Sequence, residues 1–265
     1  MMRFIAIAVA LLCSAPLALP ASAQSLWMPR DKERAVLIEV LKPSFDLVDE
    51  EFATGAMFVG YRSPPQAGAS IVIEGSFARF GFESASSFTL GNPYLGVEHA
   101  FSSSPLFMEV GVRAPLASVS EDDALAAGLV SDVARWQAFF PKTVPISVAL
   151  NLRRVSSEGV VYRLRLAPVF TIPTQRYYGD PELWVVYSAQ LGLERSAVRA
   201  GAGFVGRTIT THDYGSFSDR TETQADLHLD FGSGTARPGV DVKIPLGDLN
   251  DAVPVVVGVS LGFSF

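Results

Sequence analysis

The final segment, residues 255–265, constrains the fold of this chain more than any other feature. Large apolar residues occupy every second position, and mostly glycine and serine lie between them. Side chains of an extended strand point alternately to its two faces. The segment is therefore predicted to form a strand with one continuously apolar face and one face of small side chains. A soluble sandwich and a closed barrel in a membrane both use strands of this kind.

Several earlier segments alternate in the same way, but with charged residues on the second face. The alternating segments are residues 144–153, 162–166, 225–231 and 240–246. Arg163, Asp226 and Asp241 lie on the face opposite to the apolar residues. Such charges are costly in the buried layer of a sandwich, whereas the lumen of a transmembrane barrel is polar. The pattern therefore favours the barrel.

Counting strands back from the last one predicts an all-β fold, a transmembrane antiparallel β-barrel of about 12 strands, with roughly 10 to 14 left open. Further strands are expected near residues 35–45, 54–62, 69–80, 89–101, 105–114, 183–192 and 197–209. Links at one end, such as 156–159, are short, whereas several links at the other, such as 211–221, are longer. Pro168 falls inside an expected strand. We expect a bulge or an early strand end there, because proline cannot donate to a ladder.

One segment, at about 120–140, breaks the strand rhythm and is predicted to be a helical insert in an outer link. Ser120 can cap the helix and Pro141 stops it. Leu125, Leu129, Val133, Trp136 and Phe140 form an apolar stripe at helical spacing. The insert either lies outside the barrel or folds back into the lumen. Trp136 and Phe140 are candidates for a constriction or lid, and the alternative is a rim-packed helix without a gating role.

The beginning of the chain has the features of a signal peptide. Arg3 precedes a short apolar stretch, and Ala21, Ser22 and Ala23 supply the small residues of a cleavage site. We expect residues 1–23 to be removed and residues 24–265 to form a single domain. The formal net charge of −6 argues against a nucleic-acid partner. A mean hydropathy of +0.28 is high for a soluble secreted protein, and a closed barrel accounts for it.

Charged residues on the inward parity are unevenly distributed and are predicted to line the lumen. They are Glu39, Glu74, Glu98, Glu109, Arg153, Arg163, Arg165, Arg199, Arg207, Asp226, Asp230, Asp241 and Lys243. Opposed acidic and basic walls would set a transverse field, and the arginines would favour anionic or polar solutes. The alternative is that these groups pair and fill a narrow barrel. Both alternatives stay open, since about 12 strands fall between barrels filled by side chains and barrels that hold a channel.

One loop histidine is a candidate for catalysis, because loop residues often carry function. His212 lies beside Asp213 in a predicted outer link, with Ser216 and Ser218 close by. No motif of an outer-membrane lipid hydrolase is recognised, so we assign no catalytic residue and expect no enzyme. His228 lies between two aspartates of one strand face, which is a weak signal for a metal. We assign no metal and no cofactor.

The last strand resembles the terminal signature of bacterial outer-membrane barrels. Val257, Val259, Leu261, Phe263 and Phe265 carry the resemblance, which implies recognition by the barrel-assembly machinery. It also implies export to the outer membrane of a Gram-negative bacterium and contact with outer-membrane lipid. If this strand runs toward the periplasm, the longer links face outward.

The stretch 91–98, Gly-Asn-Pro-Tyr-Leu-Gly-Val-Glu, is similar to a phrase in proteobacterial outer-membrane transporter barrels. That resemblance implies passive transport of small solutes. The predicted function is therefore passage or selective binding of small polar or anionic solutes. Its rivals are an outer-membrane lipid hydrolase using His212 and a filled structural barrel with interaction loops.

Overall fold

The structure is a computed structural model that describes residues 35–45, 53–82, 85–101, 104–118, 122–176, 179–211, 215–232 and 234–265. The predicted signal peptide lies outside these residues. The strands are β1 (Ala35–Ser44), β2 (Gly55–Arg62), β3 (Ala69–Phe82), β4 (Ala85–Leu90), β5 (Tyr94–Ala100), β6 (Leu106–Arg113), β7 (Thr143–Val155), β8 (Val160–Pro173), β9 (Glu182–Glu194), β10 (Val198–Ile209), β11 (Thr221–Phe231), β12 (Ala236–Leu246) and β13 (Val255–Ser264). The helical segments are α2 (Asp122–Ser131), η1 (Trp136–Ala138), η3 (Ser218–Arg220) and α3 (Leu249–Ala252).

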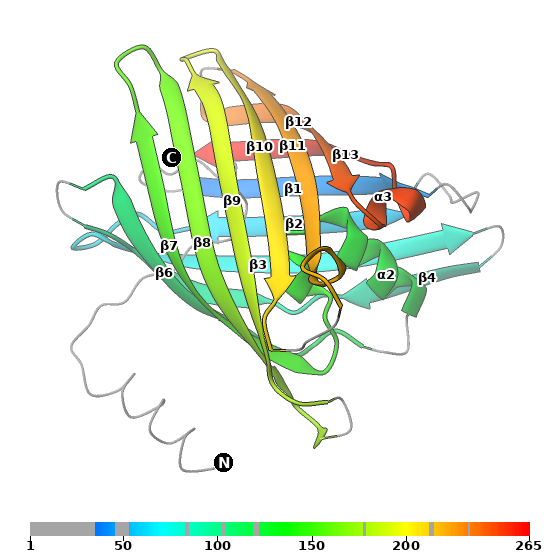
Figure 1. The fold of residues 1–265 in the computed structure, drawn as a ribbon. Helices are drawn as coiled ribbons and strands as arrows, with labels where there is room; N and C mark the ends of the chain where they lie inside the picture. Colours follow the sequence, from blue (N-terminus) through cyan, green and yellow to red (C-terminus); the bar gives the residue numbers. More distant parts are fainter. Residues whose placement is uncertain are drawn as a thin grey trace.

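These strands close into an antiparallel barrel of 12 strands, with β4 as an extra strand (Figure 1). Closure occurs where β1 pairs with β13 on one side and with β2 on the other. Every described pair of strands is antiparallel. Because β1 pairs with β13, the backbone N–H and C=O groups of the first and last strands are hydrogen-bonded to each other and leave no open edge there. The predicted fold class and strand number are confirmed.

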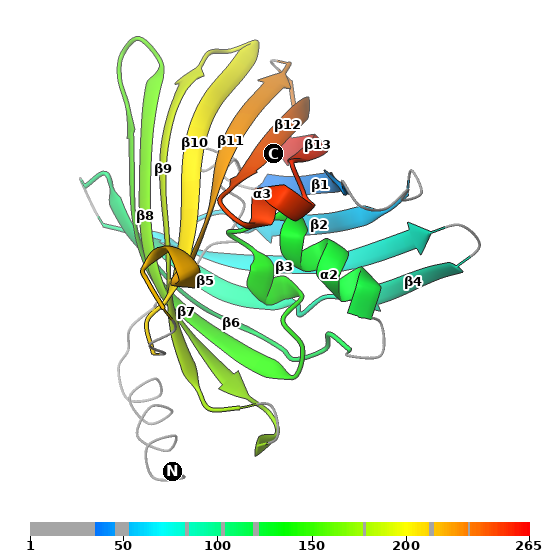
Figure 2. The ribbon, with the colours of Figure 1, turned by 45° about the vertical axis from the view of Figure 1, so that its right-hand side comes forward.

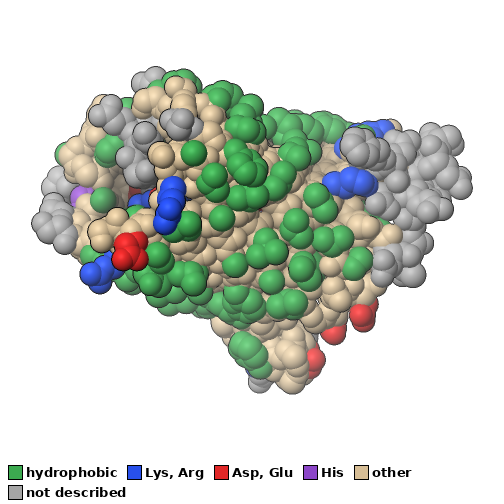
Figure 3. Space-filling model, turned by 90° about the horizontal axis from the view of Figure 1, so that it is seen from above, with side chains coloured by type: hydrophobic (Ala, Val, Ile, Leu, Met, Phe, Trp, Pro, Cys, Tyr) green, Lys and Arg blue, Asp and Glu red, His purple; other side chains and the backbone are tan. Residues whose placement is uncertain are grey.

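The outer surface of the barrel is apolar. Along β1 the side chains alternate between buried and partly or fully exposed, and the same alternation recurs around the barrel. Large apolar side chains such as Leu150, Leu164 and Leu227 are about half exposed. Figure 3 shows hydrophobic side chains covering most of one face, with few charged ones among them. This surface is the lipid-facing band of a membrane-spanning barrel. Among the described helices, none has the length and apolar character to cross a membrane.

The links differ in length between the two ends of the barrel. Ala35 of β1 pairs with Ser264 of β13, so the first described strand begins where the last one ends. At this end, the short-turn end, the links are 63–68, 101–105, 156–159, 195–197 and 232–235. At the opposite, long-link end they include 45–54, 114–142, 174–181, 210–220 and 247–254. The expected alternation of short and long links is therefore present.

The expected strand 89–101 is divided in two. β4 pairs only with the second half of β3, and β5 pairs with the first half of β3 and with β6. The division falls at Gly91, Asn92 and Pro93. Pro93 has no N–H, and the Asn92 N–H donates to the carbonyl of Ala138 in the insert at 2.5 Å instead of to a strand. A single strand was predicted, and the contact with the insert explains the difference.

Pro168 does not interrupt β8, contrary to expectation. Ser147 pairs with Val169 and Leu150 with Leu166, so the register between β7 and β8 is the same on both sides of it. Pro168 itself faces Val185 of β9 in an unbroken ladder. Its ring is compatible with extended backbone, so only a local part of the β7 ladder is lost. The expected bulge or strand end was wrong.

The helix of the insert is shorter than predicted. α2 ends at Ser131, and η1 follows after a turn. Asp132 explains the end, because its Oδ1 accepts the backbone N–H of Ala134 at 2.8 Å and thereby competes with the helical pattern. The expected cap, Ser120, lies outside the described residues. α2 packs against β1, β2, β3 and β4, within the opening of the barrel (Figure 2).

Candidate functional site

The insert folds back into the lumen, which was one of the two alternatives for it. All side chains from Ser131 to Phe139 are buried. The most extensive contacts are those of Arg135, whose side chain is 1% exposed. It lies 2.6 Å from Glu39 of β1, 3.5 Å from Glu74 of β3 and 2.8 Å from Asp132. It also lies over the ring of Phe58 in β2, 3.7 Å from its centroid. One insert residue thus binds three neighbouring strands.

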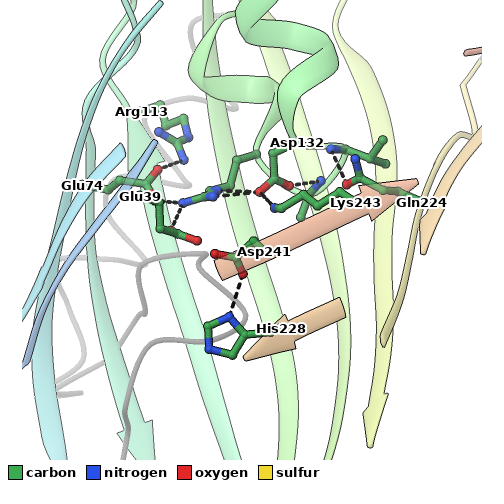
Figure 4. A network of polar contacts seen from close by, with 11 residues as sticks. Glu39, Glu74, Arg113, Asp132, Gln224, His228, Asp241 and Lys243 are labelled. Atoms are coloured by element: carbon green, nitrogen blue, oxygen red, sulfur yellow. Dashed lines mark hydrogen bonds and ion pairs between the residues drawn. The ribbon is translucent and has the colours of Figure 1, made fainter. Parts of the chain in front are cut away.

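Asp132 joins the insert to β12, which is separated from β1 by β13. Its Oδ2 lies 2.5 Å from Nζ of Lys243 in β12, and the network continues to Glu39 through Arg135 (Figure 4). The backbone N–H of Val133 donates to Gln224 of β11 at 3.3 Å. Polar contacts therefore tie this segment to β1, β3, β11 and β12.

Asp132 and Arg135 belong to the insert and not to a membrane-spanning strand. Burial alone would raise the pKa of Asp132, but the charges of Lys243 and Arg135 hold it below its ordinary value. Burial alone would lower the pKa of Arg135, but Glu39 and Asp132 hold it above its ordinary value. Both groups are therefore charged over the physiological pH range. Removing one partner would leave a buried charge uncompensated, which is strongly destabilising.

Asn92 fastens both flanks of the insert to the wall. Its Nδ2 donates to the carbonyl of Gln137 at 3.1 Å and to that of Phe140 at 2.7 Å. Its Oδ1 accepts the backbone N–H of Ala117 at 2.8 Å. Gly91 makes room for this contact, because a Cβ there would lie 2.7 Å from the carbonyl oxygen of Ala138. The Gly-Asn-Pro sequence that precedes β5 thus holds the insert against the wall.

Aromatic side chains complete the attachment. Trp136 packs at 4.6 Å from Trp184 of β9 and 4.9 Å from Phe140, measured between ring centroids. The guanidinium of Arg207 in β10 lies 5.0 Å from the centre of the Trp136 ring. Phe139 contacts Phe58 edge to face on the other side. Trp136 and Phe140 therefore lie against the inner wall, and whether they constrict a conducting path stays a prediction.

The thirteen charged residues predicted for the lumen all lie on the inward parity of their strands. Ten are buried, and Arg153, Arg163 and Arg165 are partly buried. On the acidic side, Glu98 pairs with Arg62 at 2.7 Å and Glu74 with Arg113 at 2.6 Å. Arg62 and Arg113 were not among the residues predicted to line the lumen. Arg113 shares its parity with Glu109 in the same strand, and that signal could have identified it.

The arginines that were predicted to form a basic wall are paired with carboxylates. Arg153 and Arg163 both bind Glu194, at 2.6 and 2.8 Å. Arg165 pairs with Glu109, and the latter also accepts from Tyr94 and Asn151. Further along the wall, Arg207 pairs with Glu222 and Arg237 with Asp230. Acidic and basic side chains therefore alternate around the lumen, and the two walls are not of opposite sign.

The short-turn half of the lumen holds His228 between two carboxylates. Its Nδ1 lies 2.6 Å from Asp241 and its Nε2 3.3 Å from Asp230. Two cavities of about 20 and 10 Å³ lie beside it, and both are lined by Arg199, His228 and Asp230. Each has room for about one water molecule. Among the described residues, no group of histidine, cysteine and acidic side chains is placed to hold a metal ion.

Close to the Asp132–Lys243 pair, several buried polar atoms lack a hydrogen-bond partner within the described part of the chain. They include both carboxylate oxygens of Asp226 and Nε2 of Gln224. Asp226 pairs in register with Lys243 and is 1% exposed. Buried polar groups are ordinarily bonded to protein or to water. This part of the lumen is therefore suited to water or a polar solute.

The rival catalytic residue, His212, and its neighbour Asp213 lie outside the described residues. Of that link, Ser216 and Ser218 are described, and their hydroxyl oxygens lie 2.5 Å apart. Asp219 accepts the backbone N–H of Ser216 at 2.6 Å, which lowers the pKa of that carboxyl. Asp219 thus caps this loop, and its carboxylate also hydrogen-bonds the side chains of Ser216 and Ser218. The assignment of no catalytic residue stays a prediction.

The fold of this chain is that of bacterial outer-membrane β-barrels. An outer membrane channel from Pseudomonas putida F1 superposes with a TM-score of 0.58 at 12% identity, over 89% of this chain and 99% of that one. The NanC porin gives a TM-score of 0.51 at 9% identity, over 87% and 98%. The KdgM porin gives 0.50 at 11% identity, over 87% and 99%. No protein-family model and no curated protein matches the sequence.

Proposed function

We propose that this chain is a channel for small polar solutes in the outer membrane of a Gram-negative bacterium, with residues 122–140 closing its long-link half. The observation that carries the proposal is that a segment outside the strands fills the lumen. The long-link end faces outward in this proposal, because outer-membrane barrels place short turns toward the periplasm. The resemblance in fold to the Pseudomonas putida channel and to the two porins supports transport as the class of function.

The mode of attachment supports a displaceable insert. Arg135 and Asp132 bind strand residues that are themselves charged, and Asn92 binds the insert through its backbone. The charges left on the wall after displacement would be solvated by water entering the lumen. Hydration of the polar wall would therefore offset part of the cost of displacement. The contacts of Phe139 with Phe58 and of Trp136 with Trp184 oppose displacement, because leaving would expose apolar surface.

Charge in the short-turn half supports a preference for anionic solutes. Arg153 and Arg163 share the carboxylate of Glu194, so two positive charges meet one negative charge at that point. Arg199 lies nearby and lines the same cavity as Arg163. Cationic side chains that line a narrow pore raise the local concentration of anions.

A second candidate is a barrel that is permanently filled. The pairing of Glu194 with Arg153 and Arg163 favours it, because these side chains of the adjacent strands β7, β8 and β9 are held in the short-turn half without help from the insert. The two candidates predict different results when the insert is loosened. A channel opens, and a filled barrel does not.

Planar-bilayer conductance of Arg135→Gln tests the proposal. The substitution removes the ion pairs with Glu39 and Glu74, so we expect more frequent or larger openings than in the wild type. Arg62→Gln is the matched control, since it removes a buried wall-to-wall ion pair with Glu98 that does not involve the insert. Equal conductance of wild type, Arg135→Gln and Arg62→Gln would favour the filled barrel.

A further inference from the structure

We propose that Lys243 of β12 changes partner when the insert leaves the lumen, releasing the carboxylate of Asp132 and binding that of Asp226 in β11. This partner switch rests on the proposed function, because it names the wall residue that stabilises the open channel. It gives Asp226 a role in opening that is separate from contact with a passing solute.

Asp226 and Lys243 lie directly opposite each other on neighbouring strands. They pair in register between β11 and β12, and both have the inward parity and are buried. The Cβ atoms of such a pair are about 5 Å apart, a distance that the four-carbon stem of a lysine can span. Lys243 can therefore reach Asp226 by rotating its side chain, while the barrel backbone stays in place.

In the closed arrangement the ammonium of Lys243 is bound to the insert and not to Asp226. Its Nζ lies 2.5 Å from Oδ2 of Asp132 (Figure 4). Neither carboxylate oxygen of Asp226 has a hydrogen-bond partner within the described part of the chain, although the residue is 1% exposed. A buried carboxylate without such a partner is costly. The closed arrangement therefore satisfies Asp132 and leaves Asp226 unsatisfied.

Displacement of the insert would leave a charge pair on each side. Asp132 leaves together with Arg135, whose guanidinium lies 2.8 Å from its carboxylate within the same segment. The insert thus takes its own counter-ion with it, and Lys243 stays on the wall opposite Asp226. Charge-assisted hydrogen bonds are among the strongest in proteins. The new pair therefore offsets part of the loss of the contact with the insert.

Asp241 is a second carboxylate on the same strand face as Lys243, two residues away. Its Oδ1 lies 2.6 Å from Nδ1 of His228, so this carboxylate already has a partner on the wall. Asp226 has none among the described residues. We therefore assign the switch to Asp226, and the choice between the two carboxylates can be tested.

Single-channel open probability of Asp226→Asn, measured on the full barrel, is the first test. The substitution removes an unsatisfied charge from the closed state and the partner of Lys243 from the open state. Both effects favour closure, so the open probability should fall about 10-fold. Hydrogen exchange of residues 122–140 should slow in parallel, because the insert leaves the lumen less often.

Two further variants frame this result. Asp132→Asn weakens the contact of Lys243 with the insert, and it should raise the open probability and speed the exchange. Asp230→Asn is the matched control, since Asp230 is a buried carboxylate on the same face of β11. It lies 3.3 Å from both His228 and Arg237 and makes no described contact with the insert, so neither measurement should change.

Zero-length carbodiimide crosslinking identifies the partner of Lys243 directly, because it couples an amine to a carboxylate in contact with it. Peptide mass spectrometry of the wild type should find Lys243 joined to Asp132. In Arg135→Gln, whose insert is loosened, the link to Asp226 should grow at the expense of the link to Asp132.

The partner switch is overturned if Asp226→Asn opens as often as the wild type. It is also overturned if Lys243 of the loosened variant links to Asp241 and not to Asp226. In either case the channel proposal stands as long as Arg135→Gln opens more often than the wild type. If Arg135→Gln and Asp132→Asn both stay closed, the channel proposal and the switch fail together.

Discussion

Asn92 is the position where loosening the insert should have the clearest effect. Asn92→Ala removes the hydrogen bonds to the carbonyls of Gln137 and Phe140 and the one from the N–H of Ala117. A hydrogen bond contributes about 1 kcal/mol net, so the three together hold the insert by about 3 kcal/mol. That difference raises the population of the displaced insert about 150-fold relative to the wild type. The strands keep all their ladder bonds, because Asn92 lies between β4 and β5.

Hydrogen exchange of peptides covering residues 122–140 measures this population directly. We expect faster exchange in Asn92→Ala than in the wild type, together with a higher open probability in single-channel records. Asn151→Ala is the control, since Asn151 is a buried lumen residue that bonds Glu109 and Arg165 of the wall and not the insert. If the insert exchanged at the wild-type rate in Asn92→Ala, the assigned role of Asn92 would be refuted.

Three further outcomes are expected from the contacts of the insert and the wall. Gly128→Leu should disrupt the internal packing of the insert, because even a Cβ at this position would lie 2.4 Å from the ring of Phe139, which also belongs to the insert. Faster hydrogen exchange of residues 122–140 than in the wild type would measure this effect. The pKa of Asp132 is depressed, so its stabilising charge is present above the ordinary aspartate pKa and is lost only as the pH falls through the lower value. The contribution of Asp132 to holding the insert should therefore stay constant from neutral pH down to about 4, and a rise in conductance between pH 7 and 5 that is absent from Asp132→Asn would contradict this. Arg163→Gln should shift the reversal potential in a salt gradient toward cation preference, and an unchanged potential would remove Arg163 from the selectivity of the pore.

The barrel could be predicted from the sequence because its determinant is local. Side-chain parity depends only on neighbours in the chain, so the alternation around Arg163 or Asp241 fixes which face is inward. Closure is then required, since paired strands in a membrane cannot leave an edge open. The strand break at Asn92 could not be predicted, because its cause is the carbonyl of Ala138 in a distant part of the chain.

The site was harder to predict for the same physical reason. Arg135 and Glu39 are 96 residues apart, and no periodic pattern connects an insert to the strands that receive it. The end of α2 was missed because Asp132 looks like an ordinary polar position until its hydrogen bond to Ala134 is seen. The alternation of acidic and basic partners was missed because Arg62 and Arg113 were not placed on the acidic side, although parity alone would have placed Arg113.

The most direct test of the central claim is the single-channel conductance of a barrel in which residues 122–140 are replaced by a short Gly-Ser linker. Heat-modifiable migration on a gel checks that this variant folds. If the insert closes the lumen, the variant should show a steady conductance that the wild type shows only in brief openings. A folded variant that conducts no better than the wild type would contradict the account, and the barrel would then be filled by its own wall.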